Sequence, residues 1–440
     1  MNKLLALFER YRHFVIVFGF TVVGHALGFG REVSIAYLFG ASSVSDGLLV
    51  GLAPLTLYYG LFGVGYANAA MARIKSPDNH LVIQQSLFPV LIAAVVMGSG
   101  FFFLNEIIVS ITAPGLTGEG LLLAQQIVLV SSVAAGIASV YFWFRGIRYL
   151  ESRFFRVSCS ELMPNIGILL GIFWLYQLLG LLGIALGISL GYLLQLCFVF
   201  DKSRVNFSQF SLQGLLSDDV KVIYKNTLFA ALGMSGVFVD LFVDRYFASQ
   251  LAEGSIASIN FAHKVMTLPL WTAVFAVVTV MFPRLIAMRD QPLKFNQMKI
   301  KTNILLAAFC IVNSLIFIVF AREIISLLFQ YGEFGEADVD AAAPLLMIYA
   351  AGLIAHAFVL FNTKVRFALE DFKTPLVAGV VAAMVNVVLD YTLVDSYGTS
   401  GLAVATSVAA FVNASILIFS KQTLAKKQIF DKPETGKNQA

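Results

Sequence analysis

The amino-acid sequence predicts an all-α polytopic membrane protein, and three observations support that prediction. Hydrophobic residues make up 59% of the 440 residues and charged residues 13%, whereas soluble domains are about a quarter charged. Crossing a hydrocarbon core of about 30 Å takes about 20 apolar residues per helix, and lipid leaves every backbone group to be satisfied within helices or closed barrels. Continuous apolar runs such as residues 304–320 lack the alternation of barrel strands.

We expect about twelve membrane-spanning helices. They cover residues 13–30, 47–71, 83–104, 121–144, 156–177, 179–200, 226–248, 265–288, 303–321, 341–362, 375–394 and 400–420. The basic N-terminus precedes an apolar run without the small-residue cleavage site of a signal peptide, so this run is interpreted as the first span. Little sequence is left for a soluble domain.

The positive charges are distributed unevenly. Of the 30 lysines and arginines, all but Arg31, Arg245, Lys264 and Arg322 fall on the side that holds the N-terminus. The positive-inside rule therefore places both termini in the cytoplasm. The net charge of +4 gives no reason to expect a nucleic-acid partner in a membrane protein, and the three cysteines show no metal-like or paired spacing.

The chain contains an internal repeat. "RYLESRF" from Arg148 matches "RFALEDFK" from Arg366, and "GIALGIS" from Gly183 matches "GLAVATS" from Gly401, both 218 residues later. Each copy holds an even number of spans, which predicts parallel six-helix lobes, residues 1–200 and 226–423, related by a pseudo-two-fold axis along the membrane normal around a central cavity. Residues 201–225 are expected to form a cytoplasmic linker, as an amphipathic interfacial helix or a plain tether, and 424–440 a polar cytoplasmic tail.

Ionisable residues within spans are functional candidates, because a charge near the bilayer centre costs at least about 2.5–3.5 kcal/mol. The basic candidates are Arg31, Arg245, Lys264, His25 and His263. They lie at similar places in the two halves, where the cleft would receive them, and guanidinium and ammonium groups suit a pyrophosphate. The alternative is structural pairing of Arg31 with Glu32 or Asp46 and of Arg245 with Asp244.

A second group consists of acidic and amide residues: Asp240, Asp244, Asn386, Asp390 and Thr406. Asp240 and Asp244 are four residues apart, as are Asn386 and Asp390, so each pair shares a helix face. Their oxygens could hold Na⁺, or the carboxylates could carry a proton. Alternatively, Asp390 lies in a loop and Asp244 is neutralised by Arg245.

Three further residues are candidates at helix ends and bends. Asp46 follows a serine-rich stretch and is expected to cap its own helix, to contact substrate, or both. Pro54 and Pro269, with the glycines around Pro54, could serve as hinges, although proline and glycine are also common in ordinary membrane helices. Walker and HExxH motifs are absent from the sequence, so a transporter without a cofactor is expected rather than an enzyme.

Four segments carry a family resemblance: "LGFGREVSIAYLFGASSVSDGLLV", "DRYFASQLAEGSIASINFAHKVMTLPL", "IISLLFQYGEF" and "FKTPLVAGVVAAMVNVVL". They resemble the MurJ (MviN) family of lipid II flippases, within the multidrug/oligosaccharidyl-lipid/polysaccharide exporter superfamily. The likeness covers residues 13–420.

The resemblance implies a multi-pass flippase of the bacterial inner membrane, active in peptidoglycan or polysaccharide biosynthesis, that moves an undecaprenyl-pyrophosphate-linked saccharide outward by alternating access. It also implies an ion gradient or membrane potential as driving force and a monomer among membrane lipids. The family's cavity cations fall on Arg31, on Lys264, on His25 and on a position near Tyr58, and its acidic residue falls on Asp46. The coupling cation, Na⁺ or H⁺, would fall on Asp244, Asn386, Asp390 and Thr406.

Two departures from the family keep the substrate at the level of a polyprenyl-linked saccharide, either lipid II or a polysaccharide repeat unit. The pocket has fewer cations than the family's, and the chain ends after twelve spans, whereas MurJ proteins usually carry two more. A Na⁺- or H⁺-coupled exporter of small molecules or drugs is the main alternative. It would have a cavity dominated by acidic residues. A membrane glycosyltransferase would need longer outer loops than the segments around 105–120 and 322–338.

Overall fold

The computed structural model describes residues 2–74, 78–205 and 217–420, and within them every regular element is a helix. The first half contains α1 (Asn2–Phe39), α2 (Ser43–Tyr58), the π-helix η1 (Tyr59–Gly63), α3 (Val64–Ile74), α4 (His80–Phe103), α5 (Asn105–Thr112), α6 (Gly118–Leu150), α7 (Phe154–Ser160), α8 (Met163–Leu170), the π-helix η2 (Gly171–Leu175), α9 (Tyr176–Leu179), α10 (Leu181–Val199) and the short 3₁₀ helix η3 (Lys202–Arg204).

The second half contains α12 (Asp218–Ala248), α13 (Ser255–Pro269), the π-helix η5 (Leu270–Val274), α14 (Phe275–Met288), α15 (Pro292–Val319), α16 (Ala321–Phe329), α17 (Glu336–Ala368) and α18 (Lys373–Phe419). The Ser217 side chain caps the start of α12, so the end of the expected linker is helical. The predicted amphipathic stretch and the polar tail fall largely or wholly outside the described residues.

Ten helical segments among the described residues are long and apolar enough to cross a membrane, and some of them join consecutive elements, as Ser43–Met71 joins α2, η1 and α3. Many of them extend beyond the expected spans, as α1 and α15 do, because each helix continues past the apolar core. The spans expected at 375–394 and 400–420 form one 47-residue helix that is interrupted at Gly398, with φ 54° and ψ −134°. The count of twelve stays a prediction.

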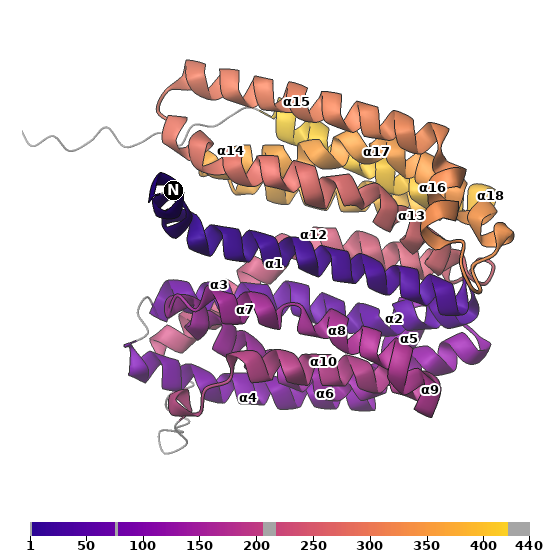
Figure 1. Ribbon diagram of the computed structural model, residues 1–440, viewed down its shortest axis with the longest axis horizontal. Coiled ribbons are helices and arrows are strands. Elements are labelled where there is room, and N and C mark those ends of the chain that lie inside the picture. The colour runs from indigo at the N-terminus through magenta and orange to yellow at the C-terminus, as the bar shows by residue number, and fades with distance from the viewer. Residues whose placement is uncertain (1, 75–77, 206–216, 421–440) are drawn as a thin grey trace, which may run out of the picture.

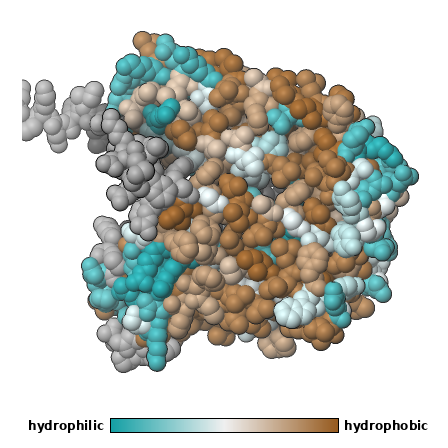
Figure 2. Space-filling model, viewed as in Figure 1, coloured by the Kyte–Doolittle hydropathy of each residue, from teal (hydrophilic) through white to brown (hydrophobic). Residues whose placement is uncertain are grey.

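The helices form two groups that lie side by side (Figure 1). One contains α2 to α10 and the other α13 to α18, and α1 and α12 run between them. Figure 2 shows a broad hydrophobic band across the molecule with hydrophilic side chains gathered at both ends. This distribution suits a bundle whose middle faces hydrocarbon and whose ends face water and lipid headgroups.

Contacts 218 residues apart recur in the two halves. Ser189 Oγ donates to the Val130 carbonyl and Ser407 Oγ donates to the Ile348 carbonyl. Gly180 and Gly398 adopt the same left-handed backbone, with φ 60° and 54°. These matched contacts support the duplication inferred from the sequence, while the pseudo-two-fold axis stays a prediction.

Two buried arginines form a further matched pair. Arg148 Nε donates to the Val199 carbonyl at 2.8 Å and Arg366 Nε donates to the Leu417 carbonyl at 3.0 Å. Each guanidinium satisfies carbonyls at the end of the last helix of its half, where helical hydrogen bonds run out. A positive charge there also complements the helix dipole.

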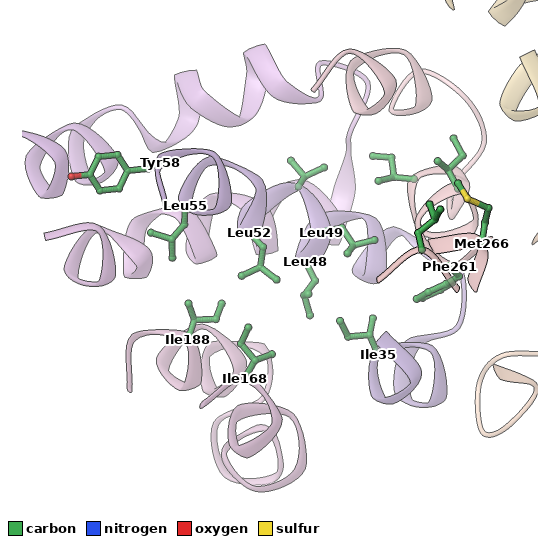
Figure 3. Packing of buried hydrophobic residues seen from close by; sticks show 14 of the residues in the cluster. Ile35, Leu48, Leu49, Leu52, Leu55, Tyr58, Ile168, Ile188, Phe261 and Met266 are labelled. Carbon is green, nitrogen blue, oxygen red and sulfur yellow. The ribbon is translucent and has the colours of Figure 1, made fainter. Parts of the chain in front are cut away.

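The buried core is continuous through both groups of helices. Figure 3 shows Leu48, Leu52 and Leu55 of α2 lying between Ile168 and Ile188 on one side and the α1 and α13 residues on the other. Phe261 and Met266 of α13 belong to the same core cluster as the α2 leucines. The packing holds α1, α2 and α13 close together, and the candidate site lies on these three helices.

Candidate functional site

Charged residues from both halves meet where α1 faces α13. Glu32 of α1 is fully buried, and its Oε1 atom lies 2.5 Å from Arg31 Nη2 and 4.0 Å from Lys264 Nζ. Asn260 of α13 donates to Glu32 Oε2 at 2.8 Å. One carboxylate thus holds a guanidinium of one half and an ammonium of the other, and the cluster has one net positive charge.

This geometry is compatible with both interpretations of Arg31 that the sequence left open, an anion site and a structural ion pair. Arg31 does pair with Glu32, as the structural alternative proposed, but the pair is shared with Lys264, whose side chain is 41% exposed. Arg31 Nη1 also donates to Asn165 Oδ1 at 3.2 Å. The two cations therefore lie close enough to contact one anion while Glu32 keeps them together.

A cavity of about 330 Å³ adjoins Arg31. It lies between α1 and, in the first group of helices, α2, η1, α8 and α10, with Glu161 supplied by the segment that joins α7 to α8. Its polar lining consists of Arg31, Thr56, Tyr59, Glu161, Asn165 and Tyr192. The central cavity expected between the two lobes stays a prediction.

Among the described residues, the other predicted basic residues form no hydrogen bond or ion pair with this cluster. They do interact electrostatically with its members, Arg245 with Glu32 and Arg31, and the two histidines with Lys264. Arg245 is 9% exposed, and its Nε and Nη1 atoms are buried without a hydrogen bond among the described residues. His25 stacks on Trp271 of η5, with ring centroids 5.2 Å apart. His263 packs against the rings of Tyr349 and His356 within the second half.

Tyr58 does not line the cavity. Its hydroxyl lies 2.6 Å from Ser139 Oγ of α6, and the residue is 8% exposed. The next residue, Tyr59, lines the cavity instead, because one step along a helix rotates the side chain by about 100°.

The predicted coupling-ion residues come together between α12 and α18. Asn386 Nδ2 donates to Asp244 Oδ1 at 3.2 Å and to Asp390 Oδ2 at 2.7 Å, and Thr406 Oγ1 donates to Asp244 Oδ2 at 3.3 Å. Asp390 is fully buried inside α18, so the interpretation of it as a loop residue is wrong. Asp244 forms no ion pair with Arg245 among the described residues, and the Asp240 side chain lies outside them.

This cluster offers several oxygens to a cation. Asn386 Oδ1 is buried and has no hydrogen-bond partner among the described residues. Buried polar atoms are normally satisfied, and carboxylate, amide and hydroxyl oxygens are the ligands that hard cations prefer. The arrangement can bind a cation or a proton.

Asp46 caps a helix of the other half instead of its own. Its Oδ2 accepts from Gly254 N at 2.8 Å and its Oδ1 from Ala257 N at 2.7 Å, at the start of α13, and the residue is 4% exposed. The α2 cap is Ser42, which accepts from Ser45 N. The serine-rich stretch thus supplies the cap, and Asp46 lies in the first turn of α2 as expected. The Asp46 side chain does not cap α2, because α13 offered it two unpaired N–H groups.

Both candidate hinges precede π-helices. Pro54 lies in α2 four residues before the end of that helix, where η1 begins, and Pro269 ends α13 immediately before η5. Proline removes a hydrogen bond from the helix, and π-helical turns are a recognised cause of kinks. Hinge motion at these two places stays a prediction.

Several residues of the site gave no signal in the sequence. Asn165, Glu161 and Tyr192 are single polar or aromatic residues in or beside apolar spans, outside the segments that carry the family resemblance. Asn260 lies inside one of those segments, but nothing in the sequence gave it a role. Their places depend on how each helix is rotated in the bundle. Glu161 and Asn165, four residues apart, offered the one local signal, a shared helix face.

The fold and site define a polytopic α-helical membrane protein built from two groups of membrane helices with charged residues at their boundary. The description of the protein-family model that matches residues 35–437 is "Lipid II flippase MurJ". The chain therefore belongs to the MurJ family.

Individual relatives cover nearly the whole chain. It is 23% identical over 421 residues to the "Probable lipid II flippase MurJ" of Aquifex aeolicus and 27% identical over 418 residues to that of Thermotoga maritima; the matches cover 92% and 94% of this chain and 82% and 84% of theirs. A solved lipid II flippase MurJ in an inward closed conformation has a TM-score of 0.79 at 22% identity, covering 92% of this chain and 87% of that chain. An inward-facing MATE family transporter has a TM-score of 0.73 at 17% identity, covering 91% and 96%.

Proposed function

We propose that this protein is a flippase that carries a polyprenyl-pyrophosphate-linked saccharide from the cytoplasmic to the outer leaflet of a bacterial inner membrane. The observation that carries the proposal is the cluster in which Arg31 and Lys264, from different halves, share the buried carboxylate of Glu32. Membership of the MurJ family and the names of its relatives support lipid II as this lipid-linked saccharide.

The diphosphate would bind against Arg31 and Lys264. Both cations lie at the boundary between the two groups of helices. Whether one ligand can contact both of them therefore depends on how the groups are arranged. If the groups rock against each other, the contacts to the ligand change, which is the basis of alternating access. A diphosphate would also compete with Glu32 for the two cations.

The Asp244, Asn386, Asp390 and Thr406 cluster would supply the coupling to an ion gradient. It lies between α12 and α18, and α12 also packs on α3 and η1 of the first half. Binding of Na⁺ or of a proton there would alter the position of α12 and so favour one arrangement of the halves. Both termini in the cytoplasm and action as a monomer are part of the same proposal.

The test is transport of a fluorescent lipid-linked saccharide in proteoliposomes, read by a membrane-impermeant quencher. Lys264→Ala should lower the rate by about tenfold or more, because a charge-assisted contact contributes about 1.5–3 kcal/mol. Arg322→Ala is the matched control, because Arg322 forms an exposed ion pair with Asp340 and should transport normally. Equal rates for Lys264→Ala and the wild type would refute the proposal.

Arg31 requires a paired variant, because Arg31→Ala leaves Glu32 buried with its nearest partner removed, which is strongly destabilising. Arg31→Gln combined with Glu32→Gln removes both charges and should restore insertion. The double variant should still fail to transport. A double variant with wild-type transport would show that the pair is structural.

A further inference from the structure

The cavity beside Arg31 has the polar lining of a ligand site rather than the apolar lining of a packing defect. It measures about 330 Å³, which is at the small end of the roughly 300–1,000 Å³ range of ligand sites. Voids inside a packed bundle are apolar and small, whereas cavities lined by polar groups hold water or a ligand. Six of its lining residues carry polar side chains, from Arg31 on α1 to Tyr192 on α10.

The charges of the lining are already compensated. Arg31 is paired with Glu32, and Glu161 Oε1 accepts from Arg145 Nη2 at 2.7 Å and from Arg145 Nε at 3.0 Å. The lining therefore has one cation and one carboxylate, each with its own partner. A bare anion would gain little there, and a neutral ligand with hydroxyl groups fits better.

The remaining lining suits a ring with both donors and acceptors. Asn165 and the hydroxyls of Tyr59 and Tyr192 can each donate and accept hydrogen bonds, and the Thr56 hydroxyl, which donates to the Leu52 carbonyl, can accept one. The apolar part is formed by Leu52, Leu55 and Ile168 (Figure 3), together with Pro164. A pyranose has the matching character, since its hydroxyls bond around its edge while its C–H faces pack on apolar and aromatic surfaces.

The place of the cavity determines which sugar would enter it. Arg31 belongs both to the lining and to the Glu32–Lys264 cluster that we propose to bind the diphosphate. In a polyprenyl-pyrophosphate saccharide the first sugar is bonded directly to the diphosphate. A diphosphate on the cluster would place this ring at the cavity, and the volume admits one ring rather than the chain of sugars.

We propose that this cavity between α1, α2, α8 and α10 is a subsite for the first, diphosphate-linked sugar ring of the substrate. The inference rests on the proposed function, because it takes the diphosphate position from it. The subsite selects for a saccharide on the carrier lipid, whereas the cation cluster alone would also accept the sugar-free diphosphate lipid.

Protection of a cysteine in the cavity tests the subsite directly. Thr56→Cys is placed in a background in which Cys159, Cys197 and Cys310 are replaced by alanine, and the reaction of its thiol with a maleimide is timed in purified protein. The soluble probes are UDP-N-acetylglucosamine, UDP and inorganic pyrophosphate. At ten times its dissociation constant, a probe that fills the site slows labelling about elevenfold, since only the empty fraction reacts.

We expect UDP-N-acetylglucosamine to protect the introduced thiol, and UDP and pyrophosphate to leave its labelling within about twofold of the unprotected rate. Ser110→Cys, on the exposed face of α5, is the control and should be unaffected by all three probes. Equal protection by all three would make the cavity an anion site and overturn the proposal. An absence of protection by any probe would overturn it too.

A blocking variant gives a second measurement. Thr56→Trp should fill the cavity and abolish binding of the sugar-bearing lipid, while binding of undecaprenyl diphosphate stays within about twofold. Thr272→Trp is the matched control, because Thr272 in η5 makes the same bond to the carbonyl four residues earlier as Thr56 does. Equal loss of both lipids in Thr56→Trp, or sugar-lipid binding that survives it, would refute the subsite.

The subsite and the flippase function can fail separately. Transport in proteoliposomes by the wild-type protein, without protection of the thiol in the Thr56→Cys variant, would leave the function standing and remove the subsite. Protection of that thiol in a protein that moves no lipid-linked saccharide would leave the sugar subsite standing and remove the flippase function.

Discussion

Asp46 gives the sharpest prediction, because its carboxylate bridges the two halves at the end of the bundle away from the N-terminus (Figure 1). It accepts hydrogen bonds from Gly254 N and Ala257 N of α13. Gly115 N donates to Ser249 Oγ at 3.1 Å at the same end of the bundle. We predict that Asp46→Ala weakens closure at this end.

The size of the effect follows from the two bonds. Hydrogen bonds to a charged group contribute about 1.5–3 kcal/mol each, so the low end alone is about 3 kcal/mol, or about a hundredfold in the ratio of closed to open states. Asp46→Asn keeps one acceptor oxygen and loses the charge, so its effect should be intermediate. Gly254 has φ +80° and lies against the Ala41 carbonyl, so these bonds depend on close backbone approach.

The assay is labelling of Ser249→Cys by a membrane-impermeant maleimide in the background without native cysteines. Ser249 is 7% exposed and should react slowly until the halves separate. Asp46→Ala should speed the reaction by about a hundredfold. Ser42→Ala, which removes a cap within one half, is the control. Equal labelling rates in Asp46→Ala and Ser42→Ala, with both proteins folded, would refute the reasoning.

Three further predictions concern the charged and capping residues. Asn386→Ala should raise the cation concentration needed for half-maximal transport by about tenfold, since one oxygen ligand and the bridge to Asp244 are lost. Transport measured against Na⁺ concentration and against pH identifies the ion. An unchanged ion dependence would count against the site. Thr406→Val should give a smaller shift in the same assay. Arg366→Met leaves the Asp371 carboxylate, 3.2 Å from its Nη1, without that partner and should cost roughly 3 kcal/mol; a lower Tm in detergent checks this, and an unchanged Tm contradicts it.

The fold class and much of the site could be predicted from the sequence because they depend on local spacing and on the cost of charge in lipid. Asn386 and Asp390 share a helix face at a spacing of four, and they do meet Asp244. The isolated cations Arg31 and Lys264 do meet at one carboxylate. In both cases the energy penalty for a lone buried charge makes a partner necessary.

Other features depended on tertiary packing and could not be predicted. Local rules assigned Asp46 to its own helix, but α13 offered it two unpaired N–H groups. Tyr58 and Tyr59 are adjacent residues with the same side chain, and only the rotation of the helix where α2 passes into η1 decides which of them lines the cavity. Asn260 is a single amide on a helix of the other half, and its bond to Glu32 depends on how the halves dock.

The duplication explains why each half holds a different site on the same scaffold. Asn386, Asp390 and Thr406 lie 218 residues after Ile168, Ile172 and Ile188, so three residues of the polar cluster that includes Asp244 correspond to isoleucines in the first half. Ile168 lines the cavity of about 330 Å³, so corresponding positions hold oxygen ligands in one half and the apolar wall of a pocket in the other. Because the matched serine, glycine and arginine contacts are preserved, these exchanges changed the chemistry without changing the packing of the helix ends. One half could then bind an ion while the other received substrate, and the α1–α13 boundary could link the two.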